Sequence, residues 1–105
     1  MIYAKTDKRR LYWLINLYRS KRIDMNTFCD EFYFCYAHEL DRNTLDIKEK
    51  YIFSELHKIV VRFSPFEEDH RLAPKASFTQ EDVNNEVEKA YKALQAAGKR
   101  PEQYL

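Results

Sequence analysis

Cys35 and His38 are the pair of residues in this chain whose types and spacing could support nucleophilic or metal chemistry. On a helix they lie one turn apart, close enough for the imidazole to approach the thiol. No third ligand or orienting group follows nearby, and His57 and His70 add no metal-ligand spacing. A single glycine also leaves no glycine-rich phosphate loop. We therefore expect no enzymatic activity, no bound metal and no cofactor.

A second chemical feature is the stretch "SPFEEDHRL", in which an aromatic residue stands beside three consecutive acids. Acids just past a helix C-terminus oppose the helix dipole, so helix formation alone does not account for them. In an extended loop, residues two apart stand roughly 6–7 Å from each other, and two such carboxylates resemble successive phosphates. Apolar neighbours would anchor the contact. We predict a binding site for a basic partner, made of Phe66, Glu67, Glu68, Asp69 and Leu72. The plainer alternative is a polar loop that ends a helix.

The charge of the chain is unevenly distributed. Residues 1–23 carry a net charge of +6 and residues 24–88 one of −8, although the whole chain carries +1. Clustered cations beside Tyr12 and Trp13 could contact phosphates and stack on bases. The cations in question are Lys8, Arg9, Arg10, Arg19, Lys21 and Arg22. However, the aromatic residues fall on or near the expected core face, so a solvated basic face that balances the acidic helices is the simpler interpretation.

The surrounding elements are predicted to be helices. The 105 residues are 45% hydrophobic and 33% charged, with one glycine and three prolines, which favours one domain of long helices over a many-stranded fold. Apolar residues recur at helical spacing over about residues 7–21, 25–40 and 45–63, and again after residue 79. The expected architecture is an all-α, antiparallel, up-down four-helix bundle. Residues 1–98 would form the domain, and residues 99–105 a loosely held tail.

Local signals place the helix ends. Asp7 and Asp24 are candidate N-caps, and Gly98 is a candidate for the position after the last C-cap. The last helix could start with a capping box of Ser77 with Gln80 or of Thr79 with Asp82, and both remain open here. Residues 64–78 would form the longest loop, and the helix over 25–40 would be the most buried.

The location of the protein is inferred from what the chain lacks. No stretch approaches the roughly 18 apolar residues of a membrane span, and the N-terminus lacks the apolar core of a signal peptide. Cys29 and Cys35 would lie on different faces of one helix, too far apart to form a disulfide. We expect a cytoplasmic protein with reduced thiols and no membrane contact.

Three stretches carry a resemblance to a known family: "LINLYRSKRIDMNTFCDEF", "YIFSELHKIVVRFSPFEEDHRL" and "FTQEDVNNEVEKAYKAL". The chain resembles the colicin D immunity family, which includes immunity proteins of contact-dependent growth inhibition systems. The shared pattern is the "SKRI" break, a phenylalanine one turn into the second helix, and acids after "RFSP". The resemblance implies a helical bundle whose acidic side chains fill the basic active site of a tRNA-cleaving toxin. By position, those acids match Glu67, Glu68 and Asp69.

Two functions follow as hypotheses. The first is an immunity protein that binds the C-terminal nuclease domain of a cognate toxin and makes no direct contact with nucleic acid. The alternative is a small helical RNA-binding or regulatory module that uses the basic first helix, the feature in which this chain departs from the family. The identity of the toxin and the oligomeric state stay open.

Overall fold

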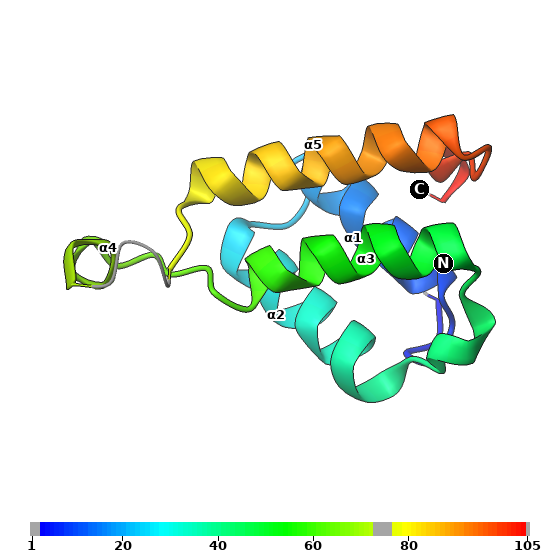
Figure 1. Cartoon of the computed structure of the whole chain (residues 1–105), viewed down its shortest axis with the longest axis horizontal. Coiled ribbons are helices and arrows are strands. Elements are labelled where there is room, and N and C mark those ends of the chain that lie inside the picture. Colours follow the sequence, from blue (N-terminus) through cyan, green and yellow to red (C-terminus); the bar gives the residue numbers. More distant parts are fainter. Residues whose placement is uncertain (1–2, 73–76, 105) are drawn as a thin grey trace.

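The computed structural model describes residues 3–72 and 77–104, and within these ranges its regular elements are all helices (Figure 1). The α-helices are α1 (Arg9–Arg19), α2 (Met25–Phe34), α3 (Ile47–Val60), α4 (Glu67–Leu72) and α5 (Gln80–Ala96). A π-helical turn (Cys35–Glu39) continues α2, and 3-10 turns form at Arg42–Thr44 and Pro101–Gln103. The all-α prediction is confirmed, whereas the up-and-down order of four helices remains a prediction.

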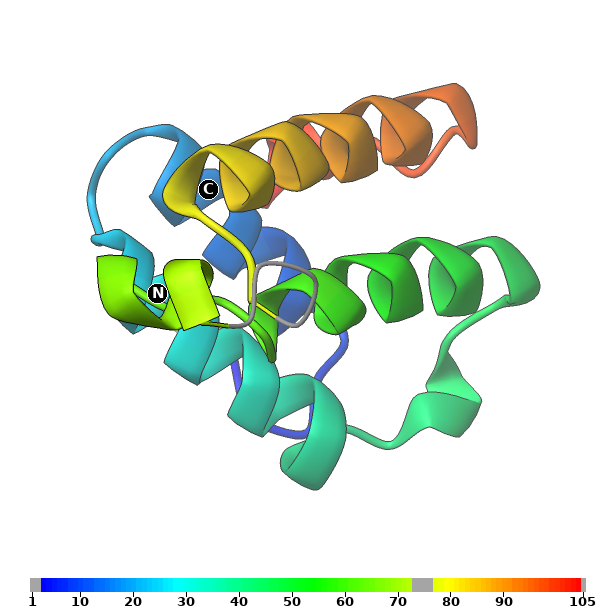
Figure 2. The same ribbon diagram turned by 60° about the vertical axis from the view of Figure 1, so that its left-hand side comes forward.

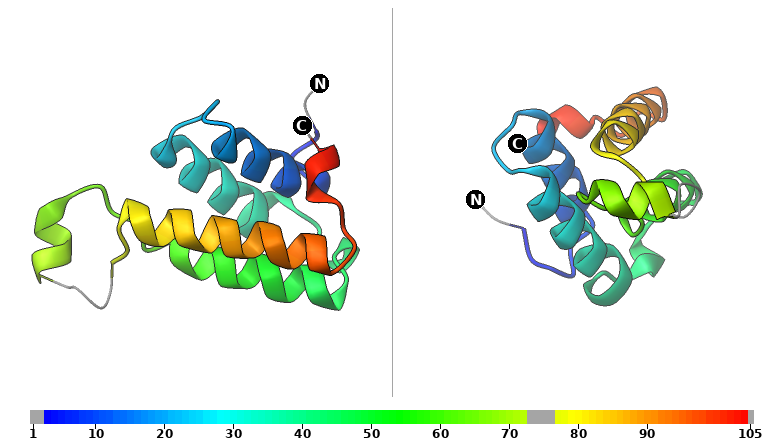
Figure 3. Two further views of the ribbon diagram at one scale, coloured as in Figure 1. Left: turned by 90° about the horizontal axis from the view of Figure 1, so that it is seen from above. Right: turned by 90° about the vertical axis from the view of Figure 1, so that its left-hand side faces the viewer.

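Four longer helices, α1, α2, α3 and α5, build the body of the molecule. Helices α3 and α5 lie side by side along its length, and α1 and α2 occupy the other side (Figures 1 and 3). The residues that the helical periodicity places on the apolar faces of α5 and of the second helix are buried. They are Val83, Val87, Ala90, Tyr91 and Leu94 in α5, and Met25, Phe28, Phe32, Cys35, Tyr36 and Leu40 in the second helix. Tyr12, which falls on or near the expected core face, is buried. Phe53 and Glu49 are buried as well, although the periodicity did not single them out.

Side-chain caps explain where three helices begin. Asp24 caps α2 as predicted, because its carboxylate accepts a hydrogen bond from the backbone of the first turn. A capping box of Asp46 and Glu49 starts α3, two residues later than expected. At α5 the box is made by Thr79 and Asp82, which decides between the two alternatives. Each box satisfies backbone N–H groups that the helix leaves without an internal partner.

Several predicted helix ends need correction. Helix α1 begins at Arg9 with Lys8 as its N-cap residue, although the Asp7 carboxylate still accepts from the Arg9 N–H at 2.9 Å. The second helix leaves α geometry after Phe34, whose side chain is 56% exposed. The prediction that the helix over 25–40 is the most buried is wrong, because six of the 11 residues of α1 are buried and only four of the 10 residues of α2.

The C-terminal segment is packed against the body, in contrast to the loosely held tail that was expected. Pro101 is buried, and its carbonyl accepts a 2.7 Å hydrogen bond from the buried Asn16 side chain on α1. The Tyr104 ring lies 4.7 Å from the ring of Tyr12. Gly98, with φ +75°, turns the chain back after α5 and makes this return possible.

Candidate functional site

The predicted binding stretch lies on a projection that we call the arm, defined as residues 64–72 and containing α4. Figures 1 and 2 show α4 at the end of the molecule where α3 finishes and α5 begins, and Figure 3 shows it standing away from the helical body. The chain leaves the helical body at Phe63 and returns to it at Phe78, and these two residues form an isolated parallel bridge. Its hydrogen bonds run from the Ser64 N–H to the Phe78 carbonyl (3.1 Å) and from the Phe78 N–H to the Arg62 carbonyl (2.8 Å).

His70 links α4 to both ends of this excursion. Its Nε2 lies 2.8 Å from the Ser64 carbonyl oxygen, and its Nδ1 lies 3.0 Å from the Ser77 hydroxyl. A carbonyl oxygen only accepts, so Nε2 must carry a proton and donate it. The Ser64 hydroxyl in turn accepts from the Phe66 N–H at 3.2 Å and shapes the turn before α4. Nothing in the sequence pattern indicated His70, because its partners meet only once α4 has formed.

The described side chains of the arm face solvent. Phe66 is 66% exposed and Leu72 is 73% exposed, while Glu68 and Arg71 are exposed as well. His70 is half-buried. The side chains of Glu67 and Asp69 lie outside the described part of the chain. The arm thus contributes none of its described side chains to the hydrophobic core.

The backbone of the arm differs from the extended loop that was predicted. Residues Glu67–Leu72 form a helix, on which positions two apart point to different sides. The phosphate-like spacing expected of Glu67 and Asp69 required an extended chain, so that part of the reasoning is wrong. The acids also occupy the first turn of α4, where the helix dipole favours negative charge. Their presence therefore has a local structural cause as well.

Two open hollows flank residues 63–65 at the base of the arm. One, of about 480 Å³, is lined by residues that include Asp24, Phe63 and His70. The other, of about 460 Å³, lies between α2 and α3 and includes Asp30 and Phe63. Val61 is 43% exposed beside the second hollow.

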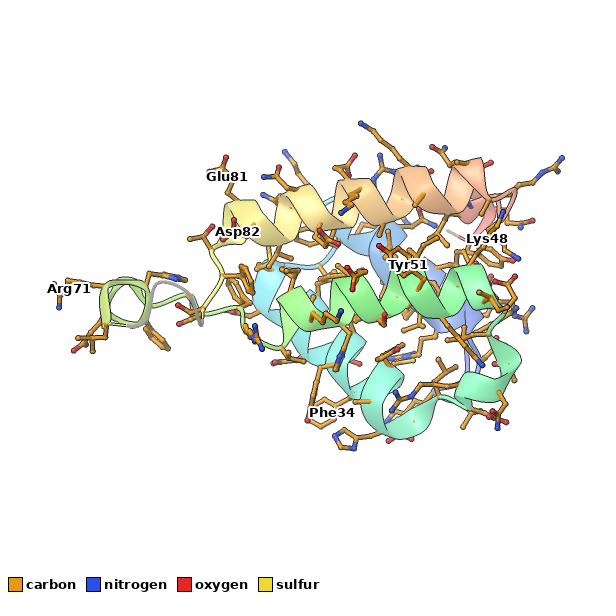
Figure 4. All side chains as sticks on the ribbon, in the orientation of Figure 1. Phe34, Lys48, Tyr51, Arg71, Glu81 and Asp82 are labelled. Carbon is orange, nitrogen blue, oxygen red and sulfur yellow. The ribbon has the colours of Figure 1, made fainter. Side chains whose placement is uncertain are left out.

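Charges of both signs surround this end of the molecule. Figure 4 shows Glu81 and Asp82 at the start of α5 and Arg71 at the outer side of the arm. Asp82 already serves in the α5 capping box. With Glu68 also exposed, the surface offers several carboxylates next to apolar side chains, which is suited to a cationic partner.

Most cations of the first helix form ion pairs with carboxylates of the same chain. Four of them form ion pairs: Lys8 with Glu49 (3.0 Å), Arg9 with Asp7 (2.6 Å), Arg10 with Glu31 (3.1 Å) and Arg19 with Glu88 (2.7 Å). Arg10 also lies over the Trp13 ring and Arg19 over the Tyr91 ring. Lys21 and Arg22 are exposed and line a hollow of about 670 Å³ between the α1–α2 turn and α5. The arrangement fits the simpler interpretation, in which the basic helix balances acidic neighbours.

The thiol–imidazole pair does not assemble into a reactive centre. Cys35 Sγ donates to the Lys5 carbonyl at 3.4 Å, and the His38 ring instead contacts the Tyr33 hydroxyl at 3.1 Å. Burial raises the pKa of Cys35 to about 11 and that of Cys29 to about 12, which keeps both thiols protonated at neutral pH. The side chains that the structure describes, which do not include those of Glu67 and Asp69, form no cluster of three metal-ligating groups.

None of the helices in the described ranges has the length and apolar character that crossing a membrane requires. Comparison of the chain with protein-family models, curated proteins and solved structures finds no match.

Proposed function

We propose that this protein is an immunity protein of the colicin D type, which binds a bacterial toxin and neutralises it by covering a basic active site. The arm would be the contact surface, through Phe66, Glu67, Glu68, Asp69 and Leu72. The cognate toxin would be a ribonuclease that cleaves tRNA, recognised through its C-terminal nuclease domain. The four longer helices would act as a rigid up-down bundle that presents the arm from the cytoplasm of the protected cell.

One observation carries the proposal: the arm projects from the body and leaves Phe66 and Leu72 largely in solvent. Exposed apolar side chains on a projecting segment contribute little to folding, and interface energies concentrate in such aromatic and aliphatic anchors. The acids beside them would steer a cationic partner and raise the association rate. The arm therefore combines apolar anchors with acidic residues, the two components that a nuclease inhibitor needs.

The helical backbone of α4 changes the proposed mechanism in one respect. Carboxylates on a helix do not follow the spacing of an RNA strand, so inhibition would rest on charge, apolar anchoring and simple occupancy of the cleft. An inhibitor that occupies the cleft does not need to imitate RNA atom by atom. Any tightly bound side chain in the cleft keeps the phosphodiester of the substrate away from the active site.

The RNA-binding alternative receives less support. Lys8, Arg10 and Arg19 have carboxylate partners within the fold, and an RNA phosphate would have to displace those partners. If RNA binding nevertheless occurs, retention on RNA should fall steeply as the salt concentration rises.

The test is co-expression with the protein encoded immediately upstream, followed by pull-down and a growth assay. We expect the wild-type chain to capture the toxin and restore growth. Glu68→Lys combined with Asp69→Lys should keep the thermal stability but weaken capture and make it less sensitive to salt. Phe66→Ala with Leu72→Ala should weaken capture too, whereas Ile47→Ala, an 85% exposed residue on α3, serves as the matched control. Full protection by both double variants would refute the assignment of the arm.

A further inference from the structure

We propose that His70 is a positioning residue, which holds α4 in its binding orientation before the partner arrives. The inference rests on the proposed function for its effect on binding, but its effect on the free protein stands alone. His70 is not among the residues predicted to contact the toxin, and its role would be to order those that do.

The first step concerns the intrinsic stability of α4. The helix has six residues, and isolated helices shorter than about 12 residues are marginal in water. A short helix in a protein is normally held by burial of an apolar face. Here Glu68, Arg71 and Leu72 are exposed, so apolar burial by these side chains is not the source of order.

The second step identifies the contact that replaces apolar burial. His70 donates from Nε2 to the Ser64 carbonyl (2.8 Å), and its Nδ1 forms a hydrogen bond with the Ser77 hydroxyl (3.0 Å). Ser64 precedes α4 and Ser77 lies just before α5, so one imidazole joins the helix to the two chain segments at its base. The Phe63–Phe78 bridge closes the base itself but makes no bond to α4.

The third step links this order to binding. Phe66 and Leu72 lie at the two ends of α4, and their relative position depends on the helix being formed. If the arm were helical in only a small fraction of molecules, the apparent affinity would fall to that fraction of the affinity of the fully helical arm. A drop of the competent population to about 1–10% would weaken binding by about tenfold to a hundredfold.

The free protein provides the first measurement. In His70→Ala, tryptic cleavage after Arg71 should accelerate by about tenfold or more, because proteases cut the locally open form. The thermal midpoint should stay close to the wild-type value, since the arm adds none of its described side chains to the core. His38→Ala is the control, because His38 is another histidine whose ring contacts a hydroxyl group, that of Tyr33, and it lies outside the arm in the π-helical turn after α2. Unchanged cleavage at Arg71 in His70→Ala overturns the proposal.

The complex provides the second measurement. Toxin affinity should fall at least about tenfold in His70→Ala. It should recover in part in His70→Gln, whose amide offers a donor nitrogen and an acceptor oxygen. Weaker binding with normal cleavage at Arg71 would mean direct contact with the toxin and would also overturn the positioning role. If the wild-type protein binds no toxin, the proposed function fails, while the cleavage assay still decides whether His70 orders the arm.

Discussion

The buried carboxylate of Glu49 offers the sharpest test of how the fold uses its basic first helix. Glu49 is 2% exposed, and it accepts hydrogen bonds from the Tyr12 hydroxyl (2.5 Å), the Lys8 ammonium (3.0 Å) and the Asp46 N–H (3.0 Å). The perturbation is Glu49→Gln, which keeps the shape of the side chain but removes its charge. The amide also places N–H donors where three donors already converge.

The stability lost in Glu49→Gln can be calculated from the hydrogen bonds that the substitution weakens. A hydrogen bond to a charged group contributes about 1.5–3 kcal/mol, and an unsatisfied buried donor costs about 1–3 kcal/mol. The hydrogen bond from the Asp46 N–H survives if the amide oxygen of Gln takes the place of Oε1. We therefore expect the free energy of unfolding to fall by about 2–3 kcal/mol. For a domain of this size, that lowers the thermal midpoint by roughly 10–20 °C. Tyr12→Phe combined with Glu49→Gln should show a coupling of about 1 kcal/mol or more.

The loss should depend on pH. Burial raises the pKa of Glu49, but the hydrogen bonds from Tyr12, from the Asp46 backbone and from Lys8 outweigh it and hold this pKa below the ordinary range. A carboxyl group with a lowered pKa in the folded state stabilises the protein fully above its unfolded value of about 4.3. That stabilisation disappears as the pH falls through the folded pKa. The difference between wild type and Glu49→Gln should therefore be large at neutral pH and shrink in acid.

Urea denaturation at several pH values measures this difference. Glu55→Gln is the matched control, since Glu55 lies on the same helix and pairs at the surface with Lys58. We expect the control to unfold like the wild type, because surface ion pairs contribute little. The reasoning is refuted if the two variants lose equal stability, or if the Glu49→Gln loss is the same at neutral and acid pH.

Further predictions concern the ends of helices and the thiols. Lys21 has φ +63°, so Lys21→Gly should raise the free energy of unfolding by about 1 kcal/mol in urea titrations. Gly98 has φ +75° with open space around it, so Gly98→Ala should lower that free energy by about 1 kcal/mol through backbone strain alone; an unchanged midpoint contradicts this. Asn16→Ala should cost about 1–3 kcal/mol and accelerate tryptic cleavage near Lys99, which would not change if the C-terminal segment were already loose. Both thiols should resist a thiol-specific reagent in the native protein, since burial raises their pKa values to about 12 (Cys29) and 11 (Cys35). Fast labelling before unfolding would show that these thiols are reactive.

The candidate site was only partly predictable. The density of acids beside Phe66 marked this segment as unusual, and both Phe66 and Leu72 are exposed as expected. The predicted extended conformation was wrong. A proline after Ser64 is compatible both with the end of one helix and with the turn that precedes another, so it did not indicate α4. The roles of the first-helix cations were also hidden. Their partners lie up to 69 residues away, as in Arg19 with Glu88, and sequence spacing carries no signal over that separation.

The sequence by itself determined the features that depend on neighbouring residues. Helical periodicity, the Asp24 cap and the turn at Gly98 all arise from interactions within a few residues, so local patterns predict them. For the capping box of α5 the local pattern left two candidates, and the structure selected Thr79 with Asp82. The tertiary structure alone decided the burial of Glu49, the packing of the C-terminal segment on α1 and the hydrogen bond from His70 to the base of the arm. These contacts join distant groups that only the folded chain brings together. Their free energy belongs to the assembled arrangement and to no single stretch of residues.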